Sequence, residues 1–299
     1  MTQAATESPV EAMRKALRET ESGQLRTYVL VDGALLRDLP SSSQRRWAAL
    51  KGQSLLSGVS DEVCAVGPIL FSIAEAPQRT DFVPLMCDLK SGRVVGSLLF
   101  SDQEPAELVR VLASLAHIKL SDGTGLLMRF YDPRVLPFWL DSLPPAYRHY
   151  VASKVVKWLF WAHDFGVQVM HLERTAADAP PPDLPMKLTL DIENSLMNAC
   201  FPFTMIERMR TEDPAALNRI DVAQRYNFFR AQIERAQAHG LSAQGELEAY
   251  CATAIEFGPT FDQDPQVHAA LAGIKRGQRF DEAIASITNE DWERVRGAK

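Results

Sequence analysis

The stretch "GLLMRFYDPRVLPFW", residues 125–139, combines two arginines, an aspartate, two prolines and four aromatic residues. Side chains alternate between the two faces of a strand, so a strand over 126–131 places Arg129 and Tyr131 on one face. Phe130 then points to the opposite face, where its apolar ring favours the core. The first half of the stretch therefore predicts a strand whose polar face is directed to a neighbouring layer or a cleft.

The second half of the stretch predicts a sharp corner. Aspartate caps helices and proline suits the first helical position, so Asp132 and Pro133 are suited to begin a helical turn. Pro137 limits that turn because it lacks the backbone N–H, and "PFWLDSL" predicts a second short helix. We expect Arg129, Asp132 and Arg134 to form charge-assisted hydrogen bonds across the corner. The corner is interpreted first as a pinned structural element, then as a surface for a partner, and last as a catalytic site.

Upstream of the corner, strand and helix patterns follow one another. "IKLSDGTGLLMRFYD", residues 118–132, is typical of a hairpin with a tight Asp-Gly turn. "EPAELVRVLASLAHI", residues 104–118, predicts a helix with one apolar face. "LRTYVLVDG", residues 25–33, predicts a strand. Its closing Asp32-Gly33 is better explained as a turn than as acid–base chemistry.

Several short apolar runs predict buried strands. Three of them are interrupted by glycine, proline or "KSG" turns and cover 65–73, 81–89 and 93–101. A fourth, "KWLFW" at 157–161, is apolar on both faces. A strand of that kind favours packing in a core or an interface over a ligand cage or a nucleic-acid stacking surface.

The segment "TAADAPPPDLP", residues 175–185, separates two parts of the chain. Consecutive prolines favour an extended, semi-rigid spacer. Residues 1–174 predict a mixed α/β lobe with a small sheet, and residues 186–299 predict an all-helical lobe, which makes the chain an α+β protein. A helix is expected over 213–240, since the segment begins with Asp-Pro and ends with Gly. Further helices are expected at 8–22, 243–257, 265–275 and after Thr288.

Composition excludes some classes of function. The 299 residues include 46% hydrophobic and 23% charged residues, and the formal net charge is −6. The acidic balance argues against a nucleic-acid-binding protein, because such proteins carry basic surfaces that neutralise phosphates. Without a secretory signal or a long apolar run, we expect a cytoplasmic protein with no stable membrane insertion. The four cysteines form no CxxC pair and are expected to be free thiols.

Motifs for catalysis or cofactor binding are missing from the sequence. It contains no Walker A, dinucleotide-binding, nucleophile-elbow or HExxH motif, so we predict no catalytic residue, no cofactor and no metal. The only close histidine pair is His163 and His171, which could share a metal with Asp164 or Glu173. A structural or surface pair is favoured because no third ligand has suitable spacing.

One more cluster is considered as a contact surface. In "RYNFFRAQI", Tyr226, Phe229 and Ile233 recur at helical spacing. They form either the inward face of a helix or a partner-binding face of the helical lobe.

The order of these segments carries a family resemblance. "YVLVDGA", "GPILFSI", "LASLAHIKLSDG" and "LLMRFYDPRVLPFWLDSL" follow one another as in the effector chaperone–adaptor family of the type VI secretion system. The resemblance covers roughly residues 26–150, and its most specific element is "RFYDPRVL" at 129–136. The helical lobe resembles the more variable second lobe of such proteins.

The resemblance implies a non-enzymatic function. Family members bind a toxin effector in the bacterial cytoplasm, often through its apolar N-terminal segment, and help to load it onto the VgrG spike protein. We therefore expect a cleft between the two lobes to receive effector helices through apolar contacts. The alternative is a small-molecule enzyme with a pocket around Arg129, Tyr131 and Asp132. An RNA-binding regulator is a third hypothesis, weakened by the acidic charge.

Overall fold

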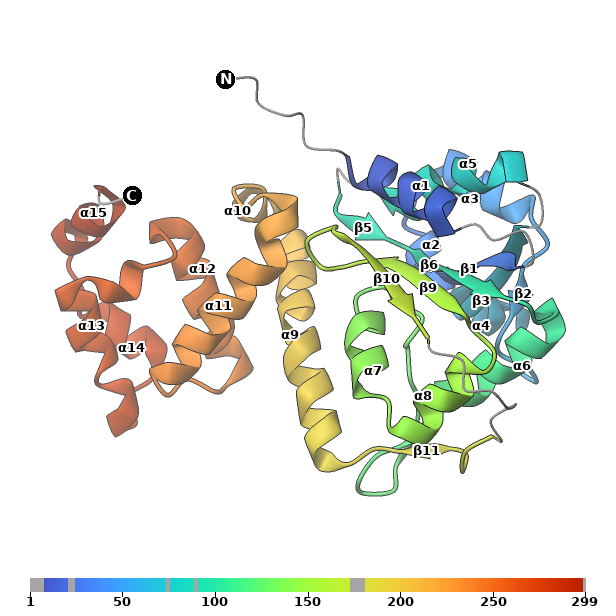
Figure 1. Cartoon of the computed structure of the whole chain (residues 1–299). Helices are drawn as coiled ribbons and strands as arrows, with labels where there is room; N and C mark the ends of the chain where they lie inside the picture. Colours follow the sequence, from blue (N-terminus) through green and yellow to red (C-terminus); the bar gives the residue numbers. More distant parts are fainter. Residues whose placement is uncertain (1–7, 21–24, 74–75, 89–90, 173–180, 298–299) are drawn as a thin grey trace. The chain divides into compact units, whose positions relative to one another are not determined.

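The computed structural model describes residues 8–20, 25–73, 76–88, 91–172 and 181–297. The chain is an α+β protein of two compact units, Met1–Ala199 and Cys200–Lys299, which are described separately below (Figure 1). Strands lie in the first unit, and the described residues of the second are helical or irregular. The fold-class prediction is therefore confirmed. Residues 175–180 of the expected spacer lie outside the described residues, and the lobe boundaries and the cleft stay predictions.

An antiparallel sheet of six strands forms the centre of the first unit, in the order β10-β9-β6-β1-β3-β2. Its strands are β1 (Arg26–Asp32), β2 (Gln53–Ser54), β3 (Pro68–Ile73), β6 (Gly96–Ser101), β9 (Lys157–Trp161) and β10 (Val167–His171). Strand β1 is central, and every residue from Thr27 to Asp32 is buried. This burial explains its continuous apolar character, since a strand covered on both faces shows no polar alternation.

Strand β9 carries the tryptophan-rich run on both faces of the sheet. Trp158, Leu159, Phe160 and Trp161 are each at most 3% exposed, which confirms the predicted packing role. The indole N–H of Trp158 donates to Ser97 Oγ at 2.9 Å, so its only polar atom is satisfied inside the core.

Helices surround the sheet. Those of the first unit are α1 (Pro9–Thr20), α2 (Gly33–Leu36), α3 (Ser41–Ala48), α4 (Asp61–Val66), α5 (Ala76–Met86), α6 (Pro105–Ala116), α7 (Leu136–Ser142) and α8 (Pro145–Ala152). Helix α6 is the one expected over 104–118. Its apolar stripe Leu108, Val111, Leu112 and Leu115 is fully buried.

Helix α5 corrects the strand prediction over 81–89. Phe82, Val83, Leu85 and Met86 are all buried, so the segment shows no alternation between a buried and an exposed face. A short apolar run of this kind cannot be assigned to strand or helix from periodicity alone. Of residues 81–88, which the structure describes, only Cys87–Asp88 forms a strand, β4, which pairs with β5 (Arg93–Val94).

A second sheet has three strands in the order β11-β7-β8. Strand β7 (His117–Lys119) pairs antiparallel with β8 (Gly125–Leu127), which confirms the predicted hairpin, and parallel with β11 (Met186–Lys187). The predicted strand over 126–131 is wrong beyond Leu127. The chain leaves the ladder after the Met128 N–H donates to the Ala116 carbonyl, and the following residues fold into turns.

Helix α9 (Leu190–Glu212) runs across the boundary between the two units. The second unit also contains α10 (Pro214–Leu217), η1 (Val222–Gln224), α11 (Arg225–Ala238), α12 (Gln244–Phe257), η2 (Phe261–Gln263), α13 (Pro265–Leu271), η3 (Ile274–Arg276), α14 (Phe280–Ala285) and α15 (Asn289–Gly297). Within the described ranges, no helix has the length and apolar character needed to cross a membrane.

The single helix predicted over 213–240 is divided in the structure. Asp213 caps α10 by accepting the N–H of Ala216, and Asp221 caps η1 by accepting the N–H of Ala223. The second aspartate begins a new helical segment because its side chain satisfies a backbone donor that a continuous helix would bond internally.

Candidate functional site

The candidate site is built around the end of β1, where Asp32 is completely buried. Its Oδ1 accepts the backbone N–H groups of Ala34 and Leu35, at 2.9 and 3.3 Å, and so caps helix α2. Gly33 follows because a Cβ there would lie 2.5 Å from the carbonyl oxygen of Ala65. The Asp-Gly dipeptide thus begins a helix in a tightly packed place, rather than forming an open turn.

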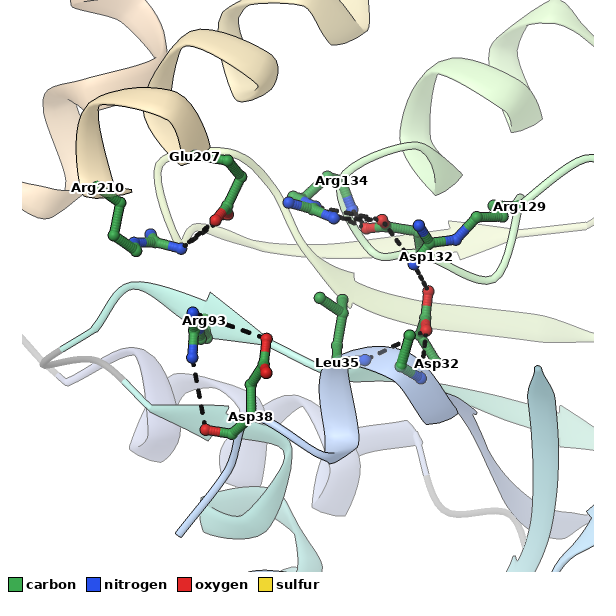
Figure 2. A network of polar contacts seen from close by, with 10 residues as sticks. Asp32, Leu35, Asp38, Arg93, Arg129, Asp132, Arg134, Glu207 and Arg210 are labelled. Carbon is green, nitrogen blue, oxygen red and sulfur yellow. Dashed lines mark hydrogen bonds and ion pairs between the residues drawn. The ribbon is translucent and has the colours of Figure 1, made fainter. Parts of the chain in front are cut away.

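Arg129 connects this strand end to the corner. Its guanidinium donates to Asp32 Oδ2 at 2.6 Å and lies 3.7 Å from Asp132 Oδ2 (Figure 2). The arginine side chain is 46% exposed, whereas the Asp32 side chain is inaccessible to solvent. Arg129 therefore covers a buried carboxylate with a partly solvated cation.

Asp132 is the second buried carboxylate, and Arg134 is its main partner. Asp132 Oδ2 accepts from the Arg134 guanidinium at 2.7 Å, and its Oδ1 accepts the Arg134 backbone N–H at 3.0 Å. The Asp132 carbonyl accepts the N–H groups of Val135 and Leu136, both at 2.9 Å. The predicted charge network across the corner is therefore present, and Asp132 both begins the turn and leads the chain into α7.

The two aromatic residues of the corner are core residues. Phe130 is fully buried and stacks on Trp139 of α7 with ring centroids 4.5 Å apart. Tyr131 is 2% exposed, and its ring meets Phe130 edge-on at 5.8 Å. Arg129 and Tyr131 therefore do not share an accessible strand face, because the backbone has already left the ladder.

Burial and pairing oppose each other in the electrostatics of the network. Burial raises the pKa of Asp32, while the hydrogen bond and the charge of Arg129 counteract the rise. Partial burial alone would lower the pKa of the Arg129 guanidinium. The hydrogen bond to Asp32 and its negative charge have the larger effect, so the pKa is raised. Burial, supported by the negative charge of Asp32, raises the pKa of Tyr131 to about 12. The tyrosine is thus a neutral phenol at physiological pH.

This arrangement is suited to holding segments together. Both carboxylates accept hydrogen bonds from arginines and backbone groups, and the phenol neither gives nor takes a proton near neutral pH. The network ties the end of β1, the start of α2 and the start of α7 to one another. Its chemistry corresponds to the pinned-corner interpretation of the sequence.

Asp32 is the member of the network that sequence reasoning missed. It lies 97 positions before Arg129, and the Asp-Gly dipeptide carries an obvious turn signal of its own. The only sequence hint is that Asp32 directly follows the apolar run Tyr28–Val31 of a strand, where a buried carboxylate needs a cationic partner.

The three aromatic and aliphatic residues predicted as a helical partner face are buried. Tyr226, Phe229 and Ile233 of α11 are 2%, 0% and 7% exposed. The Tyr226 ring lies 4.8 Å from that of Phe203 in the same unit. The burial corresponds to the inward-facing alternative of the sequence analysis, and a role of these residues in binding a partner stays a prediction.

A groove lies beside α3 in the first unit. It has a volume of about 530 Å³, and we call it the α3 groove; among its lining residues are Leu36, Arg37, Arg45, Trp47, Ile69 and Phe71. The rings of Trp47 and Phe71, with centroids 4.9 Å apart, line its floor, and the two residues are only 1% and 4% exposed. Gly52 keeps that floor open, since a Cβ there would lie 2.5 Å from the Ile69 and Phe71 side chains.

The rim of the α3 groove is basic. Arg37 and Arg45 are exposed, and no ion pair of either guanidinium occurs in the described part of the chain. Helix α2, which contributes Leu36 to the lining, is the helix that Asp32 caps. The charge network of the corner therefore fixes one wall of the α3 groove.

Metal-binding chemistry has no support among the described residues, where no group of three His, Cys, Asp or Glu is placed to hold an ion. His163 and His171 lie on the β9–β10 hairpin, where His171 faces Lys157 in register. Asp164 accepts the N–H of Gly166 at 2.9 Å and so shapes the hairpin turn. Glu173, the other ligand considered, lies outside the described residues.

Comparison with known proteins places the corner in a recognised family region. Residues 27–150 match the family described as a domain of unknown function, DUF4123. No curated protein and no solved structure matches the chain significantly. The matched range contains both buried carboxylates, both arginines of the network and every lining residue named for the α3 groove.

Proposed function

We propose that the chain is a non-enzymatic chaperone–adaptor that binds a toxin effector of the type VI secretion system in the bacterial cytoplasm. In this function it stabilises the effector and helps to load it onto the VgrG spike protein. The sequence resemblance around "RFYDPRVL" and the family match over 27–150 support the proposal. The buried charge network supports it too, because that network serves the fold and leaves no reactive group.

The α3 groove is the observation that carries the proposal. It combines an apolar floor of Trp47 and Phe71 with a rim of two exposed arginines that lack an ion-pair partner in the described ranges. An apolar groove with unpaired cations is complementary to an amphipathic helix that carries acidic residues beside its apolar face. Its volume of about 530 Å³ accommodates a few anchoring side chains of such a helix.

The effector segment that fits this groove is an apolar or helical N-terminal segment. Its apolar anchors would occupy the groove above the Trp47 and Phe71 rings, and its acidic residues would pair with Arg37 and Arg45. The corner stabilises the groove indirectly. Arg129 donates to Asp32, and Asp32 caps helix α2, which contributes Leu36 to the lining of the groove. The polar residues of "RFYDPRVL" thus act on the groove by positioning it.

The test is affinity purification of the tagged chain from its native cytoplasm, followed by mass spectrometry. We expect a secreted toxin and the spike protein to co-purify with the wild type. The double variant Arg37→Glu/Arg45→Glu should lose at least tenfold of the toxin, because like charges now face the acidic segment. Arg46→Glu is the matched control, since Arg46 is also exposed on α3 but does not line the groove.

Two results would count against the proposal. The first is a wild-type eluate that contains neither a toxin nor the spike protein. The second is an equal loss of toxin in the groove variant and in Arg46→Glu, which would mean that general surface charge, and not the groove, governs binding.

A further inference from the structure

The outer edge of strand β8 has backbone groups that find no partner among the residues that the structure describes. The Met128 N–H donates to the Ala116 carbonyl and the Leu120 N–H to the Thr124 carbonyl, at 2.7 and 2.9 Å. Hydrogen-bonded pairs alternate along an antiparallel ladder, so the backbone groups of Leu126 also point toward β7. Those of Gly125 and Leu127 then point away from β7, to the open side of the sheet.

Nothing in the described ranges covers this edge. Strand β8 is terminal in the order β11-β7-β8, and all three of its residues are exposed. The strand has the sequence GLL and so contains no proline and no charged side chain. Charged residues and proline are the usual means by which an edge strand avoids pairing with another chain. A cavity of about 330 Å³ lies along it, lined by residues of β7 and β8 and by Pro185.

The two faces of the small sheet differ in chemistry. On one face Met186, Ile118 and Leu126 are in register, and exposure increases across them from 1% and 3% to 47%. This apolar row therefore reaches the edge of the sheet without a neighbour to cover its last member. A further strand would bury Leu126 by placing an apolar side chain beside it.

The opposite face carries two lysines and, at its β8 edge, the 41%-exposed Leu127. Lys187 is in register with Lys119, and Lys119 with Gly125, whose missing side chain leaves the space next to the lysines open. Both lysines are exposed, and neither has an ion pair within the described ranges. Like charges side by side on neighbouring strands are destabilising unless an anion lies close to them.

We propose that the β8 edge binds an extended segment of a partner polypeptide as an additional strand, and that this segment alternates apolar and acidic residues. Its backbone bonds to Gly125 and Leu127, its apolar side chains cover Leu126, and its carboxylates face Lys119 and Lys187. Alternation is required because successive side chains of a strand point to opposite faces. This surface is separate from the α3 groove and does not depend on the function proposed above.

Fluorescence polarisation with labelled hexapeptides tests the proposal on the full chain. The peptide VEVEVE should bind, while VKVKVK and the block sequence VVVEEE should bind at least tenfold more weakly. In the variant Lys119→Glu/Lys187→Glu the preference should reverse toward VKVKVK. Both lysines are exposed, so this variant leaves the core unchanged.

Hydrogen exchange gives an independent readout of the backbone contacts. On VEVEVE binding, the N–H groups of Gly125 and Leu127 should become protected, while that of Leu126 is protected in the free protein already. The variant Leu127→Pro removes one outward donor and should weaken binding at least fivefold.

The proposal is overturned if VEVEVE does not bind at millimolar concentration, if VVVEEE binds equally well, or if charge reversal leaves the preference unchanged. The chaperone–adaptor function is judged separately, by toxin recovery with the α3-groove variants. The two proposals can therefore fail independently.

Discussion

Removal of Arg129 should destabilise the first unit by much more than removal of a surface arginine. In Arg129→Ala the Asp32 carboxylate stays fully buried and keeps its bonds from Ala34 and Leu35, but loses its cation. Removing one member of a buried ion pair costs about 3–5 kcal/mol. Arg129 is 46% exposed, so solvent screens part of the attraction and we expect a loss of about 2–3 kcal/mol in the free energy of unfolding.

Urea denaturation followed by tryptophan fluorescence measures this loss. Trp47, Trp139, Trp158 and Trp161 lie in the first unit and only Trp292 in the second, so the signal reports mainly on the first unit. The matched control is Arg26→Ala on the same strand as Asp32. Its ion pair with Glu104 is exposed on both sides, and we expect a cost below about 1 kcal/mol.

The pH dependence gives a second check. Burial already raises the pKa of Asp32, and without Arg129 the pKa rises further. A carboxyl group with a raised pKa in the folded state favours folding when protonated, and this stability is lost as the pH rises through the folded pKa. The deficit of Arg129→Ala should therefore be largest at neutral pH and shrink toward pH 4. Equal costs for Arg129→Ala and Arg26→Ala, or a deficit independent of pH, would refute the reasoning.

Three further predictions concern other parts of the chain. Gly33→Ala should lower the free energy of unfolding, measured by urea denaturation, by about 2–3 kcal/mol, because the new Cβ would clash with the backbone oxygens of Ala65 and Gly67. The control Gly125→Ala should leave it nearly unchanged, because its Cβ would contact nothing. Asp262 is buried and accepts hydrogen bonds from Arg235, His239 and Tyr250. Asp262→Asn should therefore destabilise the second unit by about 2–4 kcal/mol, which hydrogen exchange in α11 and α12 measures. Burial alone would raise the pKa of Asp262, but these partners lower it, so its contribution is complete at neutral pH and should be lost below about pH 4. Burial raises the pKa of the Cys87 and Cys251 thiols to about 12. In the folded protein these two cysteines should therefore react much more slowly with a thiol reagent than the partly exposed Cys64. Equal reaction rates would contradict this account.

Local patterns predicted most of the elements of the first unit. The helix over 104–118, the strand that ends at Asp32 and the hairpin before the corner were readable because each has a periodicity and a turn residue of its own. Segment 81–89 was not, because Phe82, Val83, Leu85 and Met86 are buried in adjacent pairs and give no alternation that separates a strand from a helix. The helix expected over 213–240 failed for a different reason, since Asp221 starts a second segment within it.

The candidate site was only half predictable. The contacts of Asp132 with Arg134 are local, and the spacing of the corner predicted them. The contact between Asp32 and Arg129 spans 97 positions and depends on the position of β1 in the sheet, which a single sequence does not specify. The role of Arg37 and Arg45 at the rim of the α3 groove could not be predicted from the sequence either. It depends on how α2 and α3 pack against the residues that line the groove.

The strand order has a consequence for synthesis of the chain on the ribosome. Strand β3 joins one side of β1 and β6 the other, after which β9 joins β6 and β10 joins β9. Each of these four strands therefore adds to an edge that the emerging chain has already formed, whereas β2 precedes β3 in the chain and can pair only once β3 is in place. Residues 102–156 separate β6 from β9. While they are being synthesised, Leu98–Phe100 form an apolar strand edge that has not yet paired with β9. A nascent chain paused in that interval presents an unpaired apolar strand edge, to which another chain can pair.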